Sequence, residues 1–90
     1  MTRRKVALVT GGATGIGRMI ATTLARDGAD VVIADLDMAK AEVAAGQVED
    51  AGGQAVCVCA DVSDEEAMLK LFAVADSQFG ALDILVNNAG

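Results

Sequence analysis

Residues 10–17 of this 90-residue chain read TGGATGIG, a glycine-rich stretch between two apolar segments. The short apolar run VALV at residues 6–9 precedes it and predicts a buried strand. Three apolar residues four positions apart follow, at Ile16, Ile20 and Leu24. Their spacing predicts one apolar face of a helix over residues 15–27. The glycines therefore lie in a tight turn between a strand and a helix N-terminus, whose free N–H groups suit a phosphate group.

The rest of the chain repeats this alternation of strand and helix. We expect strands over residues 31–34, 54–60 and 83–86, a helix over residues 38–51, and another that begins behind Ser63 and ends near Phe79. Asp37 can cap the first of these helices, and Ser63 with Glu66 three positions later forms a capping-box pattern for the second. Apolar strands that alternate with amphipathic helices predict one α/β unit with a parallel sheet and helices on both faces.

An acidic residue, Asp35, ends the second expected strand, 20 positions after Gly15. A carboxylate at that place can accept hydrogen bonds from both hydroxyls of an adenine ribose. Glycine spacing alone leaves open a turn without any ligand. The strand–turn–helix context and Asp35 together favour a dinucleotide site. A P-loop is excluded, because no Gly-Lys-Ser/Thr follows the turn.

The composition limits the classes of function. A net charge of −6 argues against sequence-independent nucleic-acid binding, and we expect the one basic run, at residues 3–5, to be a solvated end. The sequence has no His and no Tyr, which excludes from it a Ser-His-Asp triad, a His-ligated metal and a phenolic acid or base. No apolar run approaches the roughly 20 residues of a membrane span. We therefore expect a soluble, cytoplasmic chain without nucleic-acid or membrane partners.

The two cysteines, Cys57 and Cys59, lie two positions apart in the third expected strand. On a strand this spacing puts both side chains on one face. It differs from the CxxC pattern of redox and zinc sites. We expect buried, reduced thiols, which fits a reducing compartment.

Three motifs resemble those of the short-chain dehydrogenase/reductase family. Residues 10–17 match its TGxxxGIG turn, Asp61 and Val62 match its adenine-contacting pair, and NNAG at residues 87–90 matches its segment after the fourth strand. The resemblance covers the whole chain but only the first part of the family's domain. It implies a partial NAD(P)-binding, Rossmann-like domain: a truncated, doubly wound, three-layer fold with strand order 3-2-1-4. The first two helices would cover one face of the sheet and the third helix the other.

The resemblance also implies roles for single positions. The cofactor-binding residues that it predicts are Gly11, Thr14, Gly15, Ile16, Gly17, Asp35, Asp61, Val62, Asn87, Ala89 and Gly90. The glycine turn would wrap the adenosine ribose and the pyrophosphate, with the backbone of Ile16 facing phosphate. Asp35 would bind the adenine ribose, while Asp61 would bind the adenine amino group and Val62 would pack on the ring. Asn87 would brace the sheet and contact the cofactor, and the last two residues would line its cleft.

Charge at these positions predicts the choice of cofactor. A carboxylate at Asp35 would repel the 2′-phosphate of NADP. Thr14 and Leu36 stand where NADP-preferring members of the family often carry a basic side chain. Arg18 is a possible phosphate partner, but it lies inside the first helix and is expected to face solvent. The sequence therefore favours NAD over NADP.

The family's catalytic Ser and Tyr-x-x-x-Lys come later along the chain than residue 90, so the resemblance assigns no catalytic residue here. It implies an oxidoreductase that transfers hydride between a nicotinamide and a small-molecule alcohol or carbonyl, present as its cofactor-binding part and inactive by itself. Two alternatives remain: a non-catalytic nucleotide-binding module and a truncated fragment without a ligand. The fourth strand would be a sheet edge with unpaired backbone groups, which predicts marginal stability and self-association.

Overall fold

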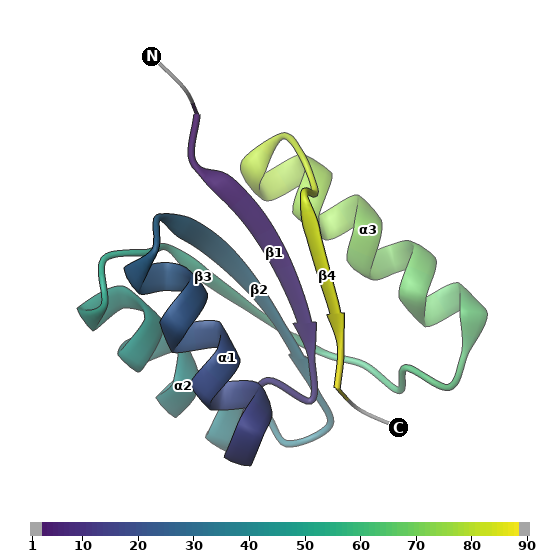
Figure 1. Cartoon of the computed structure of the whole chain (residues 1–90). Coiled ribbons are helices and arrows are strands. Elements are labelled where there is room, and N and C mark those ends of the chain that lie inside the picture. Colours follow the sequence, from purple (N-terminus) through teal and green to yellow (C-terminus); the bar gives the residue numbers. More distant parts are fainter. Residues whose placement is uncertain (1–2, 89–90) are drawn as a thin grey trace.

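The computed structural model describes residues 3–88, in which strands and helices alternate (Figure 1). The strands are β1 (Lys5–Thr10), β2 (Ala29–Asp35), β3 (Ala55–Cys59) and β4 (Ile84–Asn87), and the helices are α1 (Gly15–Arg26), α2 (Met38–Asp50) and α3 (Glu65–Phe79). Every element expected from the sequence is present. The largest difference in a boundary is at β2, which begins two residues before its apolar run, at Ala29.

The four strands form one parallel sheet in the order β3-β2-β1-β4. Helices α1 and α2 cover one face, and α3 covers the other (Figure 1). Both findings confirm the expected topology. The register pairs Thr10 of β1 with Ala34 of β2 on one side and with Asn87 of β4 on the other. The last residues of these strands therefore lie side by side at one end of the sheet.

Strands β1 and β2 are buried on both faces, which is why each reads as an unbroken apolar run. Alternate side chains enter different layers of the core. Val9, Val31 and Ile33 pack under α1 and α2, whereas Leu8 and Val32 pack under α3. The two outer strands are only partly buried. The centre of the sheet therefore holds the ends of β1 and β2 in place, and the turns that follow them start from a rigid base.

The buried face of α1 differs from the predicted one. Gly17, Ala21 and Ala25 face the sheet, whereas Ile16 is 66% exposed and Ile20 is only partly buried. Small residues let the helix axis lie close to the strands, and the larger apolar residues then fall on its flanks. The expectation that Ile16 belongs to the core face was wrong, because spacing four apart also fits the neighbouring stripe of smaller side chains.

The predicted N-cap of α3 was also wrong. Asp64, not Ser63, is the N-cap, and its carboxylate accepts the N–H of Glu66 at 3.0 Å. Ser63 lies one residue before the cap and donates its hydroxyl to Asp61 at 2.7 Å. The capping box was wrong because the carboxylate beside the serine takes the capping position. The predicted cap of α2 is confirmed, since the Asp37 carboxylate accepts the N–H of Lys40 at 3.1 Å.

The cysteines are less buried than expected. The Cys57 thiol lies under α2, 3.2 Å from the carbonyl oxygen of Ala41, and partial burial raises its pKa. Cys59 is exposed near the end of β3, which is an outer strand of the sheet. Both cysteines are free thiols. The prediction that both are buried was wrong, because Cys57 is half-buried and Cys59 is exposed. In the described part of the chain, no helix is long and apolar enough to cross a membrane.

Candidate functional site

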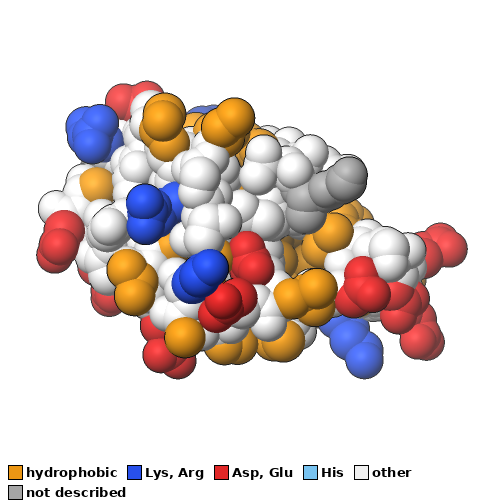
Figure 2. Space-filling model, turned by 90° about the horizontal axis from the view of Figure 1, so that it is seen from below, with side chains coloured by type: hydrophobic (Ala, Val, Ile, Leu, Met, Phe, Trp, Pro, Cys, Tyr) orange, Lys and Arg blue, Asp and Glu red, His pale blue; other side chains and the backbone are white. Residues whose placement is uncertain are grey.

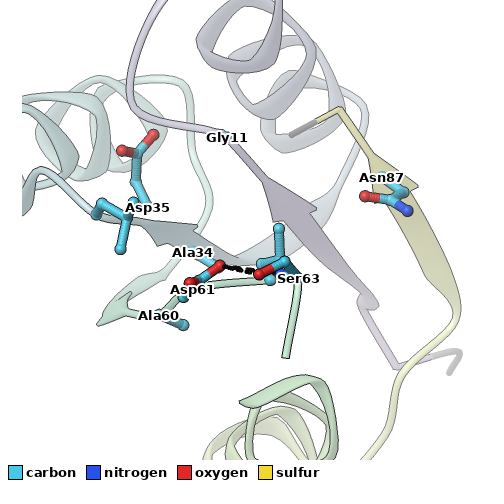
Figure 3. Close-up of a pocket in the computed structure, with 9 residues that line it drawn as sticks. Gly11, Ala34, Asp35, Ala60, Asp61, Ser63 and Asn87 are labelled. Carbon is cyan, nitrogen blue, oxygen red and sulfur yellow. Dashed lines mark hydrogen bonds between the residues drawn. The ribbon is translucent and has the colours of Figure 1, made fainter. Parts of the chain in front are cut away.

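The carboxyl ends of the strands surround a cavity of about 410 Å³. Its lining comes from the ends of β1, β2 and β4 and from the segment after β3, and consists of Gly11, Ala34, Asp35, Leu36, Ala60, Asp61, Val62, Ser63 and Asn87 (Figure 3). Figure 2 views the molecule from this end and shows charged side chains of both signs around the centre. The connection after β1 runs to α1 on one face of the sheet, whereas α3, which precedes the neighbouring strand β4, lies on the other face. Open parallel sheets bind ligands in the crevice at such a point.

The turn from β1 to α1 forms one wall of the crevice. The N–H of Gly11 donates to the carbonyl oxygen of Ala34 at 2.8 Å, and Gly11 has a φ of 65°, which favours glycine. A Cβ on Gly17 would overlap the carbonyl oxygen of Gly11, so the helix and the turn touch through backbone alone. The side chain of Thr14, the N-cap, forms no capping hydrogen bond. The first N–H groups of α1 are therefore left for a partner outside the helix.

Asp35 ties the end of β2 to this turn. Its Oδ2 accepts the N–H of Ala13 at 3.2 Å, and its Oδ1 accepts the N–H of Asp37 at 3.1 Å. Each oxygen keeps a free lone pair, because a carboxylate offers about four acceptor sites. No Lys or Arg of residues 3–88 lies within 4 Å of this carboxylate. Asp35 is thus oriented, half-buried and still able to accept hydrogen bonds from a ligand.

Asp61 lies on the opposite wall and is held by Ser63. Its Oδ1 accepts the N–H of Ser63 at 3.0 Å and the hydroxyl of Ser63 at 2.7 Å, the latter drawn in Figure 3. These two hydrogen bonds lower the pKa of Asp61, so it is ionised at neutral pH. Val62 between them is half-buried and packs against the core under α3. This wall therefore offers one charged acceptor beside an apolar surface.

Asn87 joins the site through β1. The buried hydroxyl of Thr10 donates to Asn87 Oδ1 at 3.0 Å and accepts the N–H of Asn88 at 3.0 Å. The side-chain amide of Asn88 donates to the carbonyl oxygen of Gly11 at 3.3 Å. These bonds hold the end of β4 against the glycine turn. Sequence reasoning missed Thr10 and Ser63 as supports, although each stands beside a predicted site residue.

The structure brings the nine predicted residues that it describes to one end of the molecule. Five of them line the cavity: Gly11, Asp35, Asp61, Val62 and Asn87. Gly15 and Ile16 are exposed at the start of α1, Thr14 lines a second cavity nearby, and Gly17 is buried beneath the turn. Ala89 and Gly90 lie outside the described residues.

The model of the short chain dehydrogenase family matches residues 5–90. The chain belongs to this family. Members of the short chain dehydrogenase family that it resembles include the uncharacterized oxidoreductase YxjF of Bacillus subtilis, 46% identical over 88 residues, and the 7alpha-hydroxysteroid dehydrogenase of Escherichia coli K12, 41% identical over 86 residues. These matches cover 98% and 96% of this chain but 34% of each relative, so the chain spans about a third of their length.

A solved structure of the short chain dehydrogenase family gives the same result for the fold. The crystal structure of a hydroxysteroid dehydrogenase from Escherichia coli superposes with a TM-score of 0.90 at 40% identity, over 98% of this chain and 37% of that one. The Rossmann-like α/β fold is therefore confirmed, and the chain corresponds to about a third of that enzyme.

Proposed function

We propose that this chain is the cofactor-binding part of an NAD-dependent oxidoreductase that transfers hydride between nicotinamide and a small-molecule alcohol or carbonyl. One observation carries the proposal: Asp35 and Asp61, two carboxylates without a cationic partner among the described residues, line the same cavity beside the glycine turn. The relatives named as oxidoreductases or dehydrogenases support the reaction class.

The cavity suits an adenosine. Its volume of about 410 Å³ falls in the range of small-molecule sites, about 300–1,000 Å³. Asp35 retains lone pairs for two ribose hydroxyls, and Asp61 is an exposed acceptor for an amino group. Leu36 and Val62 add apolar walls for a planar ring. The cavity thus has a carboxylate for the ribose, a second carboxylate for the adenine amino group, and apolar surface between them for the ring.

The glycine turn suits the pyrophosphate. The first N–H groups of α1 have no side-chain cap, and the positive end of the helix dipole points at this end of the sheet. The contact between Gly17 and Gly11 keeps side chains out of the approach to these groups. A bound nicotinamide supplies the hydride chemistry, while this chain binds and orients the dinucleotide. We place the Ser, Tyr and Lys that would move the proton outside this sequence, which has no Tyr.

The proposed preference is for NAD over NADP. A 2′-phosphate would meet the negative charge of Asp35, whereas a 2′-hydroxyl can donate to it. Neither Thr14 nor Leu36 is basic, so these two positions supply no counter-charge.

Calorimetric titration of the folded chain with NAD tests the binding role. We expect saturable binding that NADP reproduces more weakly. Asp50→Asn, an exposed change at the end of α2, serves as the control and should leave the affinity for NAD unchanged. Absence of heat at millimolar NAD, in a sample whose circular dichroism shows a folded α/β chain, would refute the proposal.

A non-catalytic nucleotide-binding module is the second candidate, because the same cavity and glycine turn would bind a nucleotide without turnover. The coding sequence downstream of residue 90 separates the two candidates. A Ser and a Tyr-x-x-x-Lys in that downstream sequence would support the oxidoreductase. A stop codon directly after residue 90 would refute the oxidoreductase proposal for this chain and would support the nucleotide-binding module.

We also propose that the isolated chain associates with a second copy through β4. This strand lies at the edge of the four-stranded sheet, and Leu85 in it is 48% exposed. Light scattering of the isolated chain should show dimers or larger species, and Leu85→Lys should reduce them. Val43→Lys, at an exposed apolar residue of α2 on the other face, is the matched control. A monodisperse monomer with a cooperative melt would contradict this proposal.

A further inference from the structure

The segment between β3 and α3 contains a tight turn that is fixed at both ends. The N–H of Asp64 donates to the carbonyl oxygen of Asp61 at 3.2 Å, which closes a β-turn that begins at Asp61. The N–H of Ala60 donates to the carbonyl oxygen of Asp35 at 3.3 Å and joins the start of this segment to β2. At the other end, Asp64 caps α3. The turn is therefore closed by backbone and capping bonds, in which the side chain of Ser63 takes no part.

The side chain of Ser63 binds Asp61 instead. Its hydroxyl donates to Asp61 Oδ1 at 2.7 Å, and its N–H donates to the same oxygen at 3.0 Å (Figure 3). Within residues 3–88, Asp61 Oδ2 accepts no hydrogen bond and has no cation within 4 Å. Both residues line the cavity of about 410 Å³. One carboxylate oxygen is thus occupied by Ser63, and the other is left for a ligand.

These two hydrogen bonds restrict a carboxylate that is otherwise exposed. An exposed aspartate side chain exchanges among rotamers, so the direction of its oxygens is not fixed. Hydrogen bonds to a charged acceptor are short and strong, and two of them on one oxygen hold the carboxylate in one orientation. The same bonds, above all the one from the Ser63 hydroxyl, lower the pKa of Asp61. At neutral pH, Asp61 is therefore an oriented acceptor without a proton to donate.

We propose that Ser63 is a positioning residue for base recognition: it holds Asp61 Oδ1, so that Oδ2 accepts a hydrogen bond from an amino group at C6 of a purine. The inference rests on the proposed function and adds to it the side chain on which selectivity for an aminopurine depends. Leu36 and Val62 of the same cavity provide the apolar surface for the ring. A purine without that amino group would leave Oδ2 unpaired, so the site would bind it more weakly.

Two probes that differ only in this amino group test the inference: adenosine 5′-monophosphate and purine riboside 5′-monophosphate. Each is titrated calorimetrically into the unaltered chain, Ser63→Ala and Ser63→Thr. We expect Ser63→Ala to weaken binding of the adenosine probe on the order of fivefold and of the other probe less than about twofold, because only the first uses the oriented oxygen. Ser63→Thr keeps the hydroxyl and should restore the affinity. Ser77→Ala, which removes an exposed hydroxyl that bonds to the carbonyl oxygen of Val74 within α3, should change neither.

A double-mutant cycle separates action through Asp61 from a general effect on the turn. If Ser63 acts through Asp61, Ser63→Ala should have no further effect on the adenosine probe in a chain that already has Asp61→Ala. An equal loss of affinity in that background would overturn the inference. Equal weakening of both probes by Ser63→Ala, or failure of Ser63→Thr to restore the affinity, would overturn it as well.

The remaining outcomes separate this inference from the proposed function. If the chain binds NAD and both probes, but Ser63→Ala leaves the preference for the adenosine probe unchanged, only the inference fails. If the chain is folded by circular dichroism and binds neither NAD nor the probes, the proposed function fails too.

Discussion

The two ends of the sheet use the same kind of side chain in different ways. At the amino ends of the strands, Asp83 accepts two hydrogen bonds from Arg3, at 2.6 and 2.7 Å, and one from the N–H of Val6 at 2.8 Å. At the carboxyl ends, Asp35 accepts only backbone N–H groups, among them that of Ala13. The first carboxylate has a cation and joins β4 to β1. The second has none and keeps acceptor capacity.

A second pair of residues repeats the contrast. Asp30 at the start of β2 accepts Arg4 at 2.8 Å and the N–H of Gln54 at 2.9 Å, which joins β1, β2 and the start of β3. Asp61 at the other end accepts only the N–H and hydroxyl of Ser63. At the amino ends of the strands the carboxylates are paired with arginines, whereas the two carboxylates of the candidate site have no cationic partner among the described residues. Carboxylates occur at both ends of the sheet, and pairing with arginine is what distinguishes the amino end from the candidate site.

The strongest test breaks the candidate site at its glycine turn. Gly17→Ala should cost on the order of 3 kcal/mol of stability and abolish measurable NAD binding, because the added Cβ would overlap the carbonyl oxygen of Gly11. Thermal unfolding and calorimetry measure the two effects. Gly46→Ala is the control, since its Cβ in exposed α2 would meet nothing within 4 Å and should add about 0.5–1 kcal/mol of stability. Full NAD binding by Gly17→Ala would show that the close approach is dispensable.

The next test removes one unpaired carboxylate. Asp35→Asn should weaken NAD on the order of tenfold and weaken NADP less, because the ribose loses a charged acceptor while the 2′-phosphate loses a repulsive neighbour. Titration of both dinucleotides measures the change in preference. The control is Asp37→Asn, two residues after Asp35. Asn can still cap α2, so this variant should leave NAD binding unchanged. An unaltered preference in Asp35→Asn would refute the ribose role.

A third test removes the pairing between Asp83 and Arg3 at the amino ends of the strands. Asp83→Asn should lower the Tm by several degrees, because it removes a bidentate pairing with Arg3. The affinity of the folded chain for NAD should stay the same, since Asp83 lies at the opposite end of the sheet. Asp76→Asn, at an exposed residue of α3, is the control for loss of one negative charge. Loss of NAD affinity without loss of stability would contradict the division between the two ends.

The smallest expected effect is in acid. The pairing with Arg3 holds the pKa of Asp83 well below its usual range, and hydrogen bonds from Ser63 lower that of Asp61. A lowered pKa in the folded state gives stability that is present above the unfolded pKa of about 3.9 and is lost as the pH falls through the folded pKa. Denaturant unfolding should therefore show falling stability below about pH 4. Asp83→Asn should flatten this decline, and an identical slope in both proteins would exclude Asp83 as a source of it.

Most of the secondary structure was predictable because its causes are local. The apolar runs of β1 and β2, the Asp37 cap and the stop at Gly80 each depend on a few adjacent residues. Two local patterns gave wrong predictions because a neighbouring residue could fill the same role. The stripe of small residues, not Ile16, is the buried face of α1, and Asp64, not Ser63, caps α3. The choice between neighbours depended on packing, which periodicity does not describe.

The alternation of elements, the glycine turn and five of the residues that line the cavity could be predicted from the sequence alone. Contacts between distant parts of the chain follow only from the folded arrangement. Thr10 reaches Asn87 only because β1 and β4 pair in one register, and Arg18 and Lys40 share a cavity only because α1 and α2 lie side by side. Likewise, the arginines at the amino end meet Asp83 and Asp30 across strands. Local propensity acts over a few residues, whereas charge pairing across the sheet needs the whole chain in place.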